Sequence, residues 1–150
     1  MKEIHFVVVG KIIQWQRAVH TINKKTNRIV THNNKDHVVY QNLIKEAFKN
    51  VTDVNVMPFD DKTAIDVTVN AYFFAPKTMP KKYLKALQNG EKVRRLRTPD
   101  DDNIAKMVLD SLNKIGYPDD KQCSIHTASY WTIGQEHLEI TLKASDNLAW

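Results

Sequence analysis

The stretch of sequence from residue 65 to residue 73 reads IDVTVNAYF and carries the clearest structural signal in the chain. Apolar side chains occupy every odd position, while Asp66, Thr68 and Asn70 lie between them. This period of two is typical of a β-strand that buries one face and exposes the other. We therefore predict a strand over residues 65–73 with its odd-numbered side chains in the core.

A second pattern, with the period of a helix, covers residues 103–115. At 100° per residue, five apolar side chains fall on one face of such a helix: Ile104, Met107, Val108, Leu112 and Ile115. The pattern predicts an amphipathic helix over residues 103–115 that turns this face away from solvent.

Shorter patterns complete the order of elements. They predict strands over residues 4–9, 122–131 and 137–143, a hairpin within residues 10–34 that turns near residues 24–27, and helices over residues 37–51 and 80–88. Asp36 is a candidate N-cap of the first of these helices, and Asn89 and Gly90 form a stop signal for the second. A turn at residues 133–135 is expected to join the last two strands as an antiparallel hairpin. This order predicts an α+β fold with a mixed, largely antiparallel sheet and two to three helices.

Length and composition exclude several classes of protein. The chain has 150 residues, which is typical of one domain spanning residues 1–150, and its 42% hydrophobic and 26% charged residues are typical of a globular protein. No apolar run approaches the roughly 18 residues that a membrane span needs, and the N-terminal apolar run is too short for a signal peptide. The lone Cys123 excludes a disulfide framework. We expect a cytoplasmic protein without a membrane partner.

The charge of the chain is concentrated in one segment. The formal net charge is +5, yet residues 77–97 alone hold eight bases and one acid, a net charge of +7. A local excess of this size beside a slightly acidic remainder indicates a polyanionic partner such as nucleic acid. A solvated basic loop without a partner remains open on charge alone.

Directly after this basic segment, residues 98–106 read TPDDDNIAK. Helix capping and the helix dipole account for one or two of the three carboxylates, but three that lie close together repel one another and gain from a bound cation. Oxygen ligands without Cys or paired His favour Mg²⁺ or Mn²⁺. Asp102, Lys106 and Asp110 are spaced four apart and share one stripe of the expected helix. Asp119 and Asp120 follow in a loop that could fold back toward the helix start.

Three motifs then occur in order: DDDNIAK at residues 100–106, LDSLN at 109–113 and DDKQ at 119–122. Together they resemble the RusA family of Holliday-junction resolvases. The pairs Gly10–Lys11 and Gln16–Arg17 are similar to the basic opening of phage and prophage members.

The resemblance implies a RusA-like fold and a homodimeric, Mg²⁺-dependent crossover junction endodeoxyribonuclease. Such an enzyme nicks branched DNA, the four-way junction, symmetrically during DNA recombination and repair, with Mn²⁺ as a possible substitute. Asp100, Asp102 and Asp120 would be the metal-binding catalytic carboxylates, and Lys106 the active-site lysine. Asp110 and Asp119 would be supporting residues. The bases that we expect to contact DNA are Lys11, Arg17, Lys81, Lys82, Arg94, Arg95 and Arg97.

Two other functions stay open at this point. In one, the aspartates only cap a helix and the chain binds DNA without cutting it. In the other, the D-x-D spacing belongs to a metal-dependent glycosyltransferase. The second is disfavoured because the pattern shows no nucleotide-binding α/β unit and leaves the basic segment without a role.

Overall fold

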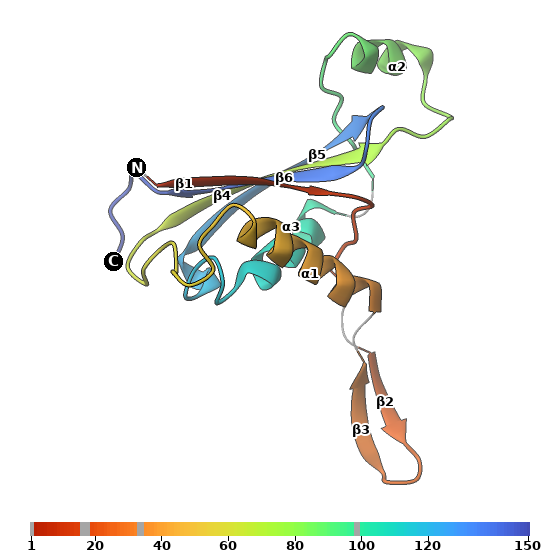
Figure 1. The fold of residues 1–150 in the computed structure, drawn as a ribbon. Helices are drawn as coiled ribbons and strands as arrows, with labels where there is room; N and C mark the ends of the chain where they lie inside the picture. Colours follow the sequence, from red (N-terminus) through yellow and green to blue (C-terminus); the bar gives the residue numbers. More distant parts are fainter. Residues whose placement is uncertain (1, 16–18, 33–34, 98–99) are drawn as a thin grey trace.

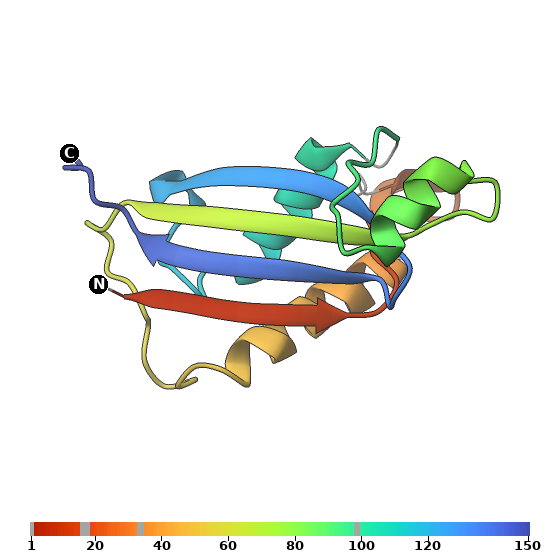
Figure 2. The ribbon, with the colours of Figure 1, turned by 90° about the horizontal axis from the view of Figure 1, so that it is seen from above.

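The strand predicted over residues 65–73 lies inside the main sheet of the computed structural model, which describes residues 2–15, 19–32, 35–97 and 100–150. β4 (Ile65–Phe74) runs parallel to β5 (Cys123–Thr132) on one side and antiparallel to β6 (His137–Ala144) on the other. β1 (Glu3–Val9) pairs antiparallel with β6, which gives the strand order β1-β6-β4-β5 (Figure 2). The mixed, largely antiparallel sheet and the α+β class are confirmed.

One face of the sheet holds the core. The odd-numbered residues of β4 are at most 7% exposed, as the period of two predicts: Ile65, Val67, Val69, Ala71 and Phe73. Helices α1 (Lys35–Lys49) and α3 (Asp101–Leu112) cover this face (Figure 1). Four members of the predicted apolar stripe on α3 are at most 1% exposed: Ile104, Met107, Val108 and Leu112. Because burying such a side chain stabilises a fold by roughly 1.5–3 kcal/mol, this stripe fixes α3 against the sheet.

The ends of the helices differ from the prediction. α3 begins at Asp101 instead of residue 103, since acidic side chains in a first turn are stabilised by the helix dipole. It ends at Leu112 instead of residue 115, because Asn113 is extended and Lys114 adopts a φ of 68°. α1 begins at Lys35, so Asp36 lies in its first turn and is not its N-cap.

The antiparallel hairpin predicted between the last two strands is wrong. β4 lies between β5 and β6, so these strands are consecutive in sequence but are not neighbours in the sheet. Crossing one strand requires about 10 Å, and the four residues 133–136 can span about 13 Å when extended. A short connection therefore fits both arrangements, and the turn signal at residues 133–135 does not distinguish them.

Glu136 holds this crossover in place. One carboxylate oxygen accepts a hydrogen bond from the backbone N–H of Phe74 at 2.9 Å, and the other accepts one from Ile12 at 3.2 Å. The backbone carbonyl of Glu136 also accepts a hydrogen bond from the N–H of Gly10 at 2.9 Å. A single residue therefore joins the crossover to the end of β4 and to the chain that leaves β1.

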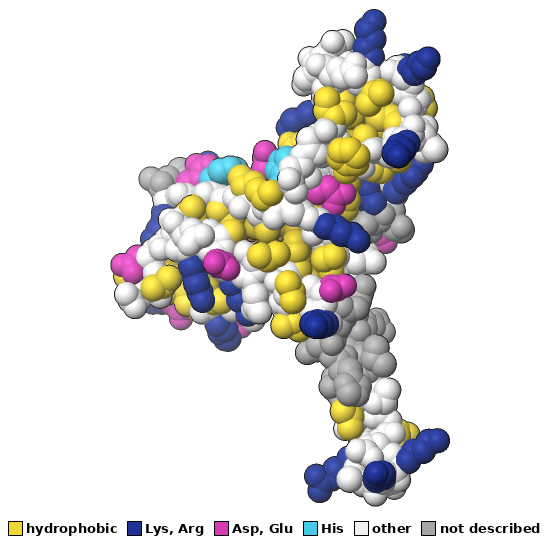
Figure 3. Space-filling model, turned by 45° about the vertical axis from the view of Figure 1, so that its right-hand side comes forward, with side chains coloured by type: hydrophobic (Ala, Val, Ile, Leu, Met, Phe, Trp, Pro, Cys, Tyr) yellow, Lys and Arg dark blue, Asp and Glu magenta, His cyan; other side chains and the backbone are white. Residues whose placement is uncertain are grey.

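Two parts project from this body. The hairpin of β2 (Val19–Asn23) and β3 (Arg28–His32) extends away from the helices, and its turn confirms the prediction for residues 24–27 (Figure 1). On the opposite side of the sheet, α2 (Lys81–Gln88) forms a lobe with residues 76–92, which we call the α2 lobe (Figure 1). The helix stops as predicted, with Asn89 as C-cap and Gly90 at a φ of 82°. Figure 3 shows Lys and Arg side chains on both projections.

The chain returns from the α2 lobe along the outer edge of β5. Residues 93–97, which we call the edge segment, form a bridge between Arg94 and Tyr130. The N–H of Arg95 donates to the Ser129 carbonyl at 2.8 Å, and the N–H of Trp131 donates to the Val93 carbonyl at 2.9 Å. The basic residues of this segment are thus held by a sheet edge.

Within the described ranges, none of the helices has the length and apolar character to cross a bilayer.

The role of Glu136 can be tested by substitution. Glu136→Ala removes the acceptor of two backbone N–H groups, and we expect it to lower the free energy of unfolding by about 1–3 kcal/mol. Glu136→Gln retains one carbonyl acceptor but turns an amide donor toward a backbone N–H. Its free energy of unfolding should therefore fall by an amount similar to, or slightly smaller than, that of Glu136→Ala. Urea denaturation measures both. Glu3→Ala, at an exposed position of β1, is the matched control and should change stability by less than about 0.5 kcal/mol. Equal stability of Glu136→Ala and wild type would contradict this role.

Candidate functional site

The acidic residues after the edge segment form the start of α3. Asp100 occupies the N-cap position in an extended conformation, with φ −69° and ψ 152°, but its side chain makes no capping hydrogen bond. Asp101 and Asp102 form the first turn. Asp100 and Asp102 are both exposed, so their carboxylate oxygens are accessible from solvent. Helix capping therefore does not account for Asp100.

Asp101 has a different environment from its two neighbours. Its carboxylate accepts a hydrogen bond from the Ser129 hydroxyl at 2.5 Å, and Ser129 is only 1% exposed on β5. The guanidinium of Arg94 lies 3.9 Å from the other carboxylate oxygen. Because an exposed ion pair of this length stabilises little, the buried hydroxyl is the main contact. Asp101 fixes the start of α3 against β5 and the edge segment, and sequence reasoning did not identify Ser129 as its partner.

Arginine and aspartate side chains line one open pocket at this end of the molecule, which we call the acidic pocket. Its volume is about 520 Å³, and its lining consists of Arg94, Arg95, Leu96, Arg97, Asp100, Asp101 and Asp102. The two exposed carboxylates can bind a cation, while the arginines can bind an anion beside it. A phosphate group with a bound metal ion has this combination of charges.

Lys106 follows Asp102 by one helical turn, as the spacing predicts. Its ammonium lies 4.9 Å from the centre of the Trp15 ring, which is a cation–π distance. The backbone N–H of Trp15 donates to the carbonyl of Asn103 at 3.2 Å. The chain after β1 thus contacts both the first turn of α3 and the Lys106 side chain, which is not among the residues that line the pocket.

Asp120 is not brought to this pocket. It begins a 3-10 turn, η1 (Asp120–Gln122), and the charged groups that act on it are Asp119, Asp110 and Lys114. Asp110 lies eight residues beyond Asp102, which is about 12 Å along the helix. Burial, reinforced by Asp119, raises the pKa of the Asp120 carboxyl above its usual range. The loop therefore stays at the C-terminal end of α3 and does not fold back to its start.

Asp119 and Gln122 in the DDKQ motif have a structural role that the sequence did not reveal. The Asp119 carboxylate accepts from the N–H of Lys121 at 3.0 Å, and the Gln122 side chain accepts from the N–H of Asp119 at 3.2 Å. The Gln122 amide also donates to the carbonyls of Asp60 and Thr63, at 2.7 and 2.8 Å. The motif fastens the η1 turn to the loop before β4. Hydrogen bonding by the N–H of Lys121 holds the pKa of Asp119 below its usual range.

The described residues offer few side-chain ligands at any one place. This suits Mg²⁺ better than a metal ion whose ligands all come from the protein. Among residues 2–15, 19–32, 35–97 and 100–150, no group of three or more His, Cys, Asp or Glu side chains could hold a metal ion. Mg²⁺ often binds through one or two carboxylates, with water and substrate phosphate as its other ligands. Asp100 and Asp102 fit that pattern.

The basic residues expected to contact DNA are distributed over three places. Arg94 and Arg97 line the acidic pocket, and Lys81 and Lys82 lie on α2. Lys11 borders a different pocket, near the crossover at residues 133–136. Arg17 lies outside the described residues.

The side chain of Arg95 packs against the protein itself. Its guanidinium lies 3.8 Å from the centre of the Phe73 ring and 5.3 Å from that of Trp131, and it donates to the carbonyl of Arg97 at 3.0 Å. Burial lowers its pKa below the usual range. The Arg95 guanidinium is therefore engaged by contacts within the protein.

The chain was compared with curated proteins and with models of protein families. A comparison with curated proteins gives no match. The model of the family described as Endodeoxyribonuclease RusA matches residues 14–143, which include β4, the α2 lobe, all of α3 and the η1 turn. The match covers most of the chain and contains the acidic pocket. The chain belongs to the RusA endodeoxyribonuclease family.

Proposed function

We propose that this protein is a Mg²⁺-dependent endonuclease that resolves four-way DNA junctions by paired symmetric nicks. The observation that carries the proposal is the pocket that is lined by both Asp100 and Asp102 and by Arg94 and Arg97. Family membership supplies the substrate class, a DNA phosphodiester, and the pocket supplies the two kinds of charge that its hydrolysis requires.

The residues have separable roles in this proposal. Asp100 and Asp102 would hold Mg²⁺, which when bound lowers the pKa of a water molecule and neutralises charge on the phosphate. Arg94 and Arg97 would bind the DNA backbone beside the scissile phosphate, a type of contact that positions DNA without reading its sequence. Lys106, held by Trp15, would stabilise negative charge that develops on the phosphate.

Asp120 does not line this site within one copy of the chain, and in our proposal a second copy supplies it. Within one copy it lies with Asp110 and Lys114 at the far end of α3. A homodimer with two-fold symmetry could place Asp120 of each copy near Asp100 and Asp102 of the other. The same symmetry would place two sites on opposite arms of a junction, as paired nicking requires.

A DNA-binding protein without catalytic activity is the alternative, and the structure does not favour it. That alternative requires the aspartates to cap α3, whereas Asp100 makes no capping hydrogen bond and Asp102 is exposed in the first turn. Of the three carboxylates, only Asp101 has a clear structural partner, Ser129.

Asp102→Asn tests the metal-binding role. We expect at least a 100-fold loss of junction cleavage in Mg²⁺, because substitutions even outside the direct ligand set often reduce activity by about 10–100-fold. Binding of the junction in EDTA should persist or strengthen, since one negative charge near the DNA is removed. Cleavage is measured on a synthetic mobile four-way junction, and EDTA should abolish it in wild type. Asp66→Asn, at an exposed position on the open face of β4, is the control and should cleave normally. Normal cleavage by Asp102→Asn would refute the assignment.

Mixing two inactive variants tests whether Asp120 acts in the partner's site. Asp102→Asn and Asp120→Asn should each be inactive alone. If Asp120 is supplied by the partner, a mixed dimer has one site with both substitutions and one site with neither. We therefore expect refolding of the two together to restore single-strand nicking to a fraction of the wild-type rate. If both residues served a site in the same copy, every site in the mixed dimer would carry one substitution and no nicking would return.

The salt dependence of binding tests the arginines. Arg97→Ala should make the slope of log K against log salt concentration less negative by about 1, because one phosphate contact is lost. Junction binding in EDTA, measured over a series of salt concentrations, gives the slope. Lys62→Ala removes one positive charge from an exposed loop before β4 and should leave the slope unchanged. An equal change in both variants would indicate a general charge effect and no contact by Arg97.

A further inference from the structure

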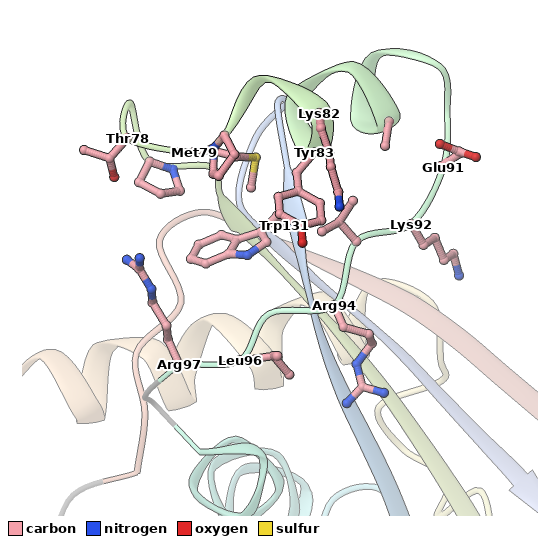
Figure 4. Close-up of a pocket in the computed structure, with 14 residues that line it drawn as sticks. Thr78, Met79, Lys82, Tyr83, Glu91, Lys92, Arg94, Leu96, Arg97 and Trp131 are labelled. Carbon is pink, nitrogen blue, oxygen red and sulfur yellow. The ribbon is translucent and has the colours of Figure 1, made fainter.

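A second cavity, of about 770 Å³, lies between the α2 lobe and the edge segment. Its volume falls in the range of about 300–1,000 Å³ that is usual for sites that enclose a small molecule. Residues of α2, of β5 and of the edge segment line it, and Figure 4 shows Tyr83 of α2 and Trp131 of β5 above the edge segment. The proposed chemistry at Asp100 and Asp102 does not use it.

Apolar side chains of the α2 lobe line this cavity and are not part of the hydrophobic core. α2 has an apolar side but none of its residues is buried. Tyr83 is 42% exposed on α2, and Met79 precedes the helix. Figure 3 shows the hydrophobic side chains of the lobe gathered in a hollow with Lys and Arg side chains around them. An exposed apolar patch with polar residues around it is typical of a surface that binds a ligand or another macromolecule.

Two aromatic rings line the cavity, and one of them is held firmly. Trp131 lies on β5, and its backbone N–H bonds to Val93 of the edge segment. The guanidinium of Arg97 lies 5.7 Å from the centre of the Trp131 ring. Tyr83 lies on α2, across from the edge segment (Figure 4). Aromatic side chains on separate elements provide planar surfaces on which a nucleobase can stack.

The charges around these rings suit a phosphate. The cavity is lined by four cationic side chains, of Lys82, Lys92, Arg94 and Arg97, and by one acidic side chain, of Glu91. A base on the aromatic rings would have its own phosphates near a net excess of positive charge. A neutral or cationic apolar ligand would gain nothing from this arrangement.

The cavity adjoins the acidic pocket, since the two share lining residues. Arg94, Leu96 and Arg97 line both. A DNA strand whose phosphate lies at Asp100 and Asp102 would therefore have an adjacent nucleotide at the mouth of the cavity. The two spaces would bind neighbouring parts of one strand.

We propose that this cavity binds one unpaired nucleotide of the DNA substrate, with its base stacked on Tyr83 and Trp131 and its phosphates near Lys82, Arg94 and Arg97. This inference rests on the DNA-directed function proposed above and adds a binding site to it. Both faces of a base are covered within a duplex, so only an unstacked base can reach these rings. The site would thus contribute to selection of distorted or branched DNA over intact duplex.

Binding of two linear duplexes in EDTA tests the proposal. One duplex carries a single unpaired thymidine, and the other has the same sequence fully paired. We expect wild type to bind the first about 10-fold more tightly, the size of effect usual for one base–aromatic stack. Tyr83→Ala should abolish this preference, whereas Tyr83→Phe, which keeps the ring, should retain it. Trp150→Ala, which removes an exposed aromatic side chain outside the cavity, should also retain it.

Photocrosslinking locates the base directly. 5-Iodouracil at the unpaired position, irradiated in the complex, should crosslink to Tyr83 or Trp131, as mass spectrometry of the peptides would show. Crosslinks confined to other parts of the chain would overturn the proposal. So would equal affinity of wild type for the two duplexes, or an unchanged preference in Tyr83→Ala.

Cleavage of four-way junctions in Mg²⁺ by the same proteins separates this proposal from the nuclease function. A wild-type protein that cleaves junctions but shows no preference for the unpaired thymidine would overturn the cavity assignment alone. A protein that shows the preference and the expected crosslink but cleaves no DNA would support the cavity and overturn the nuclease function.

Discussion

The structure depends on the position of β4 between two strands that follow one another in sequence. β4 is paired along both edges, and the side chains on one of its faces are at most 7% exposed. α1 and α3 can cover only this apolar face, because the alternate residues of β4 are polar or partly exposed. β5 lies parallel beside β4, and the C-terminal half of β5 supports the start of α3 and the edge segment.

The site follows from that support. Ser129 on β5 is buried and donates to Asp101, so the first turn of α3 is held at the edge of the sheet. The backbone carbonyl of the same residue accepts from Arg95, which holds the edge segment. One residue thus brings the acidic turn and the arginines together, although the sequence separates it from both. Because α3 is held rigidly against the sheet, the positions of its two exposed carboxylates are well defined, as a binding site requires.

Local patterns in the sequence predicted the elements well and the contacts between them poorly. The strand at residues 65–73 and the buried stripe of α3 were predictable because burial imposes a period on the chain itself. The place of β4 between β5 and β6 was not, since a connection of four residues suits both a hairpin and a crossover. The acidic motif predicted a site at the start of α3. It did not predict how far Asp120 lies from Asp102, because that distance depends on the path of residues 113–119, which have no periodic pattern. The partners Ser129 and Glu136 have no local signal either, because a hydrogen bond between distant segments leaves no pattern in either of them.

The three consecutive aspartates illustrate why a count of charges does not define a site. Asp101 is engaged by Ser129 and lies 3.9 Å from Arg94, so it serves the fold and partly balances the charge of the edge segment. Asp100 and Asp102 flank it, and both are exposed. Repulsion between these two is not relieved by a capping hydrogen bond of Asp100, which makes a cation the most effective stabilising partner for the turn. A phosphate would in turn be attracted to that cation and to Arg97. In the function proposed above, the fold would position the carboxylates, the carboxylates would favour the cation, and the cation and the arginines together would favour the DNA backbone.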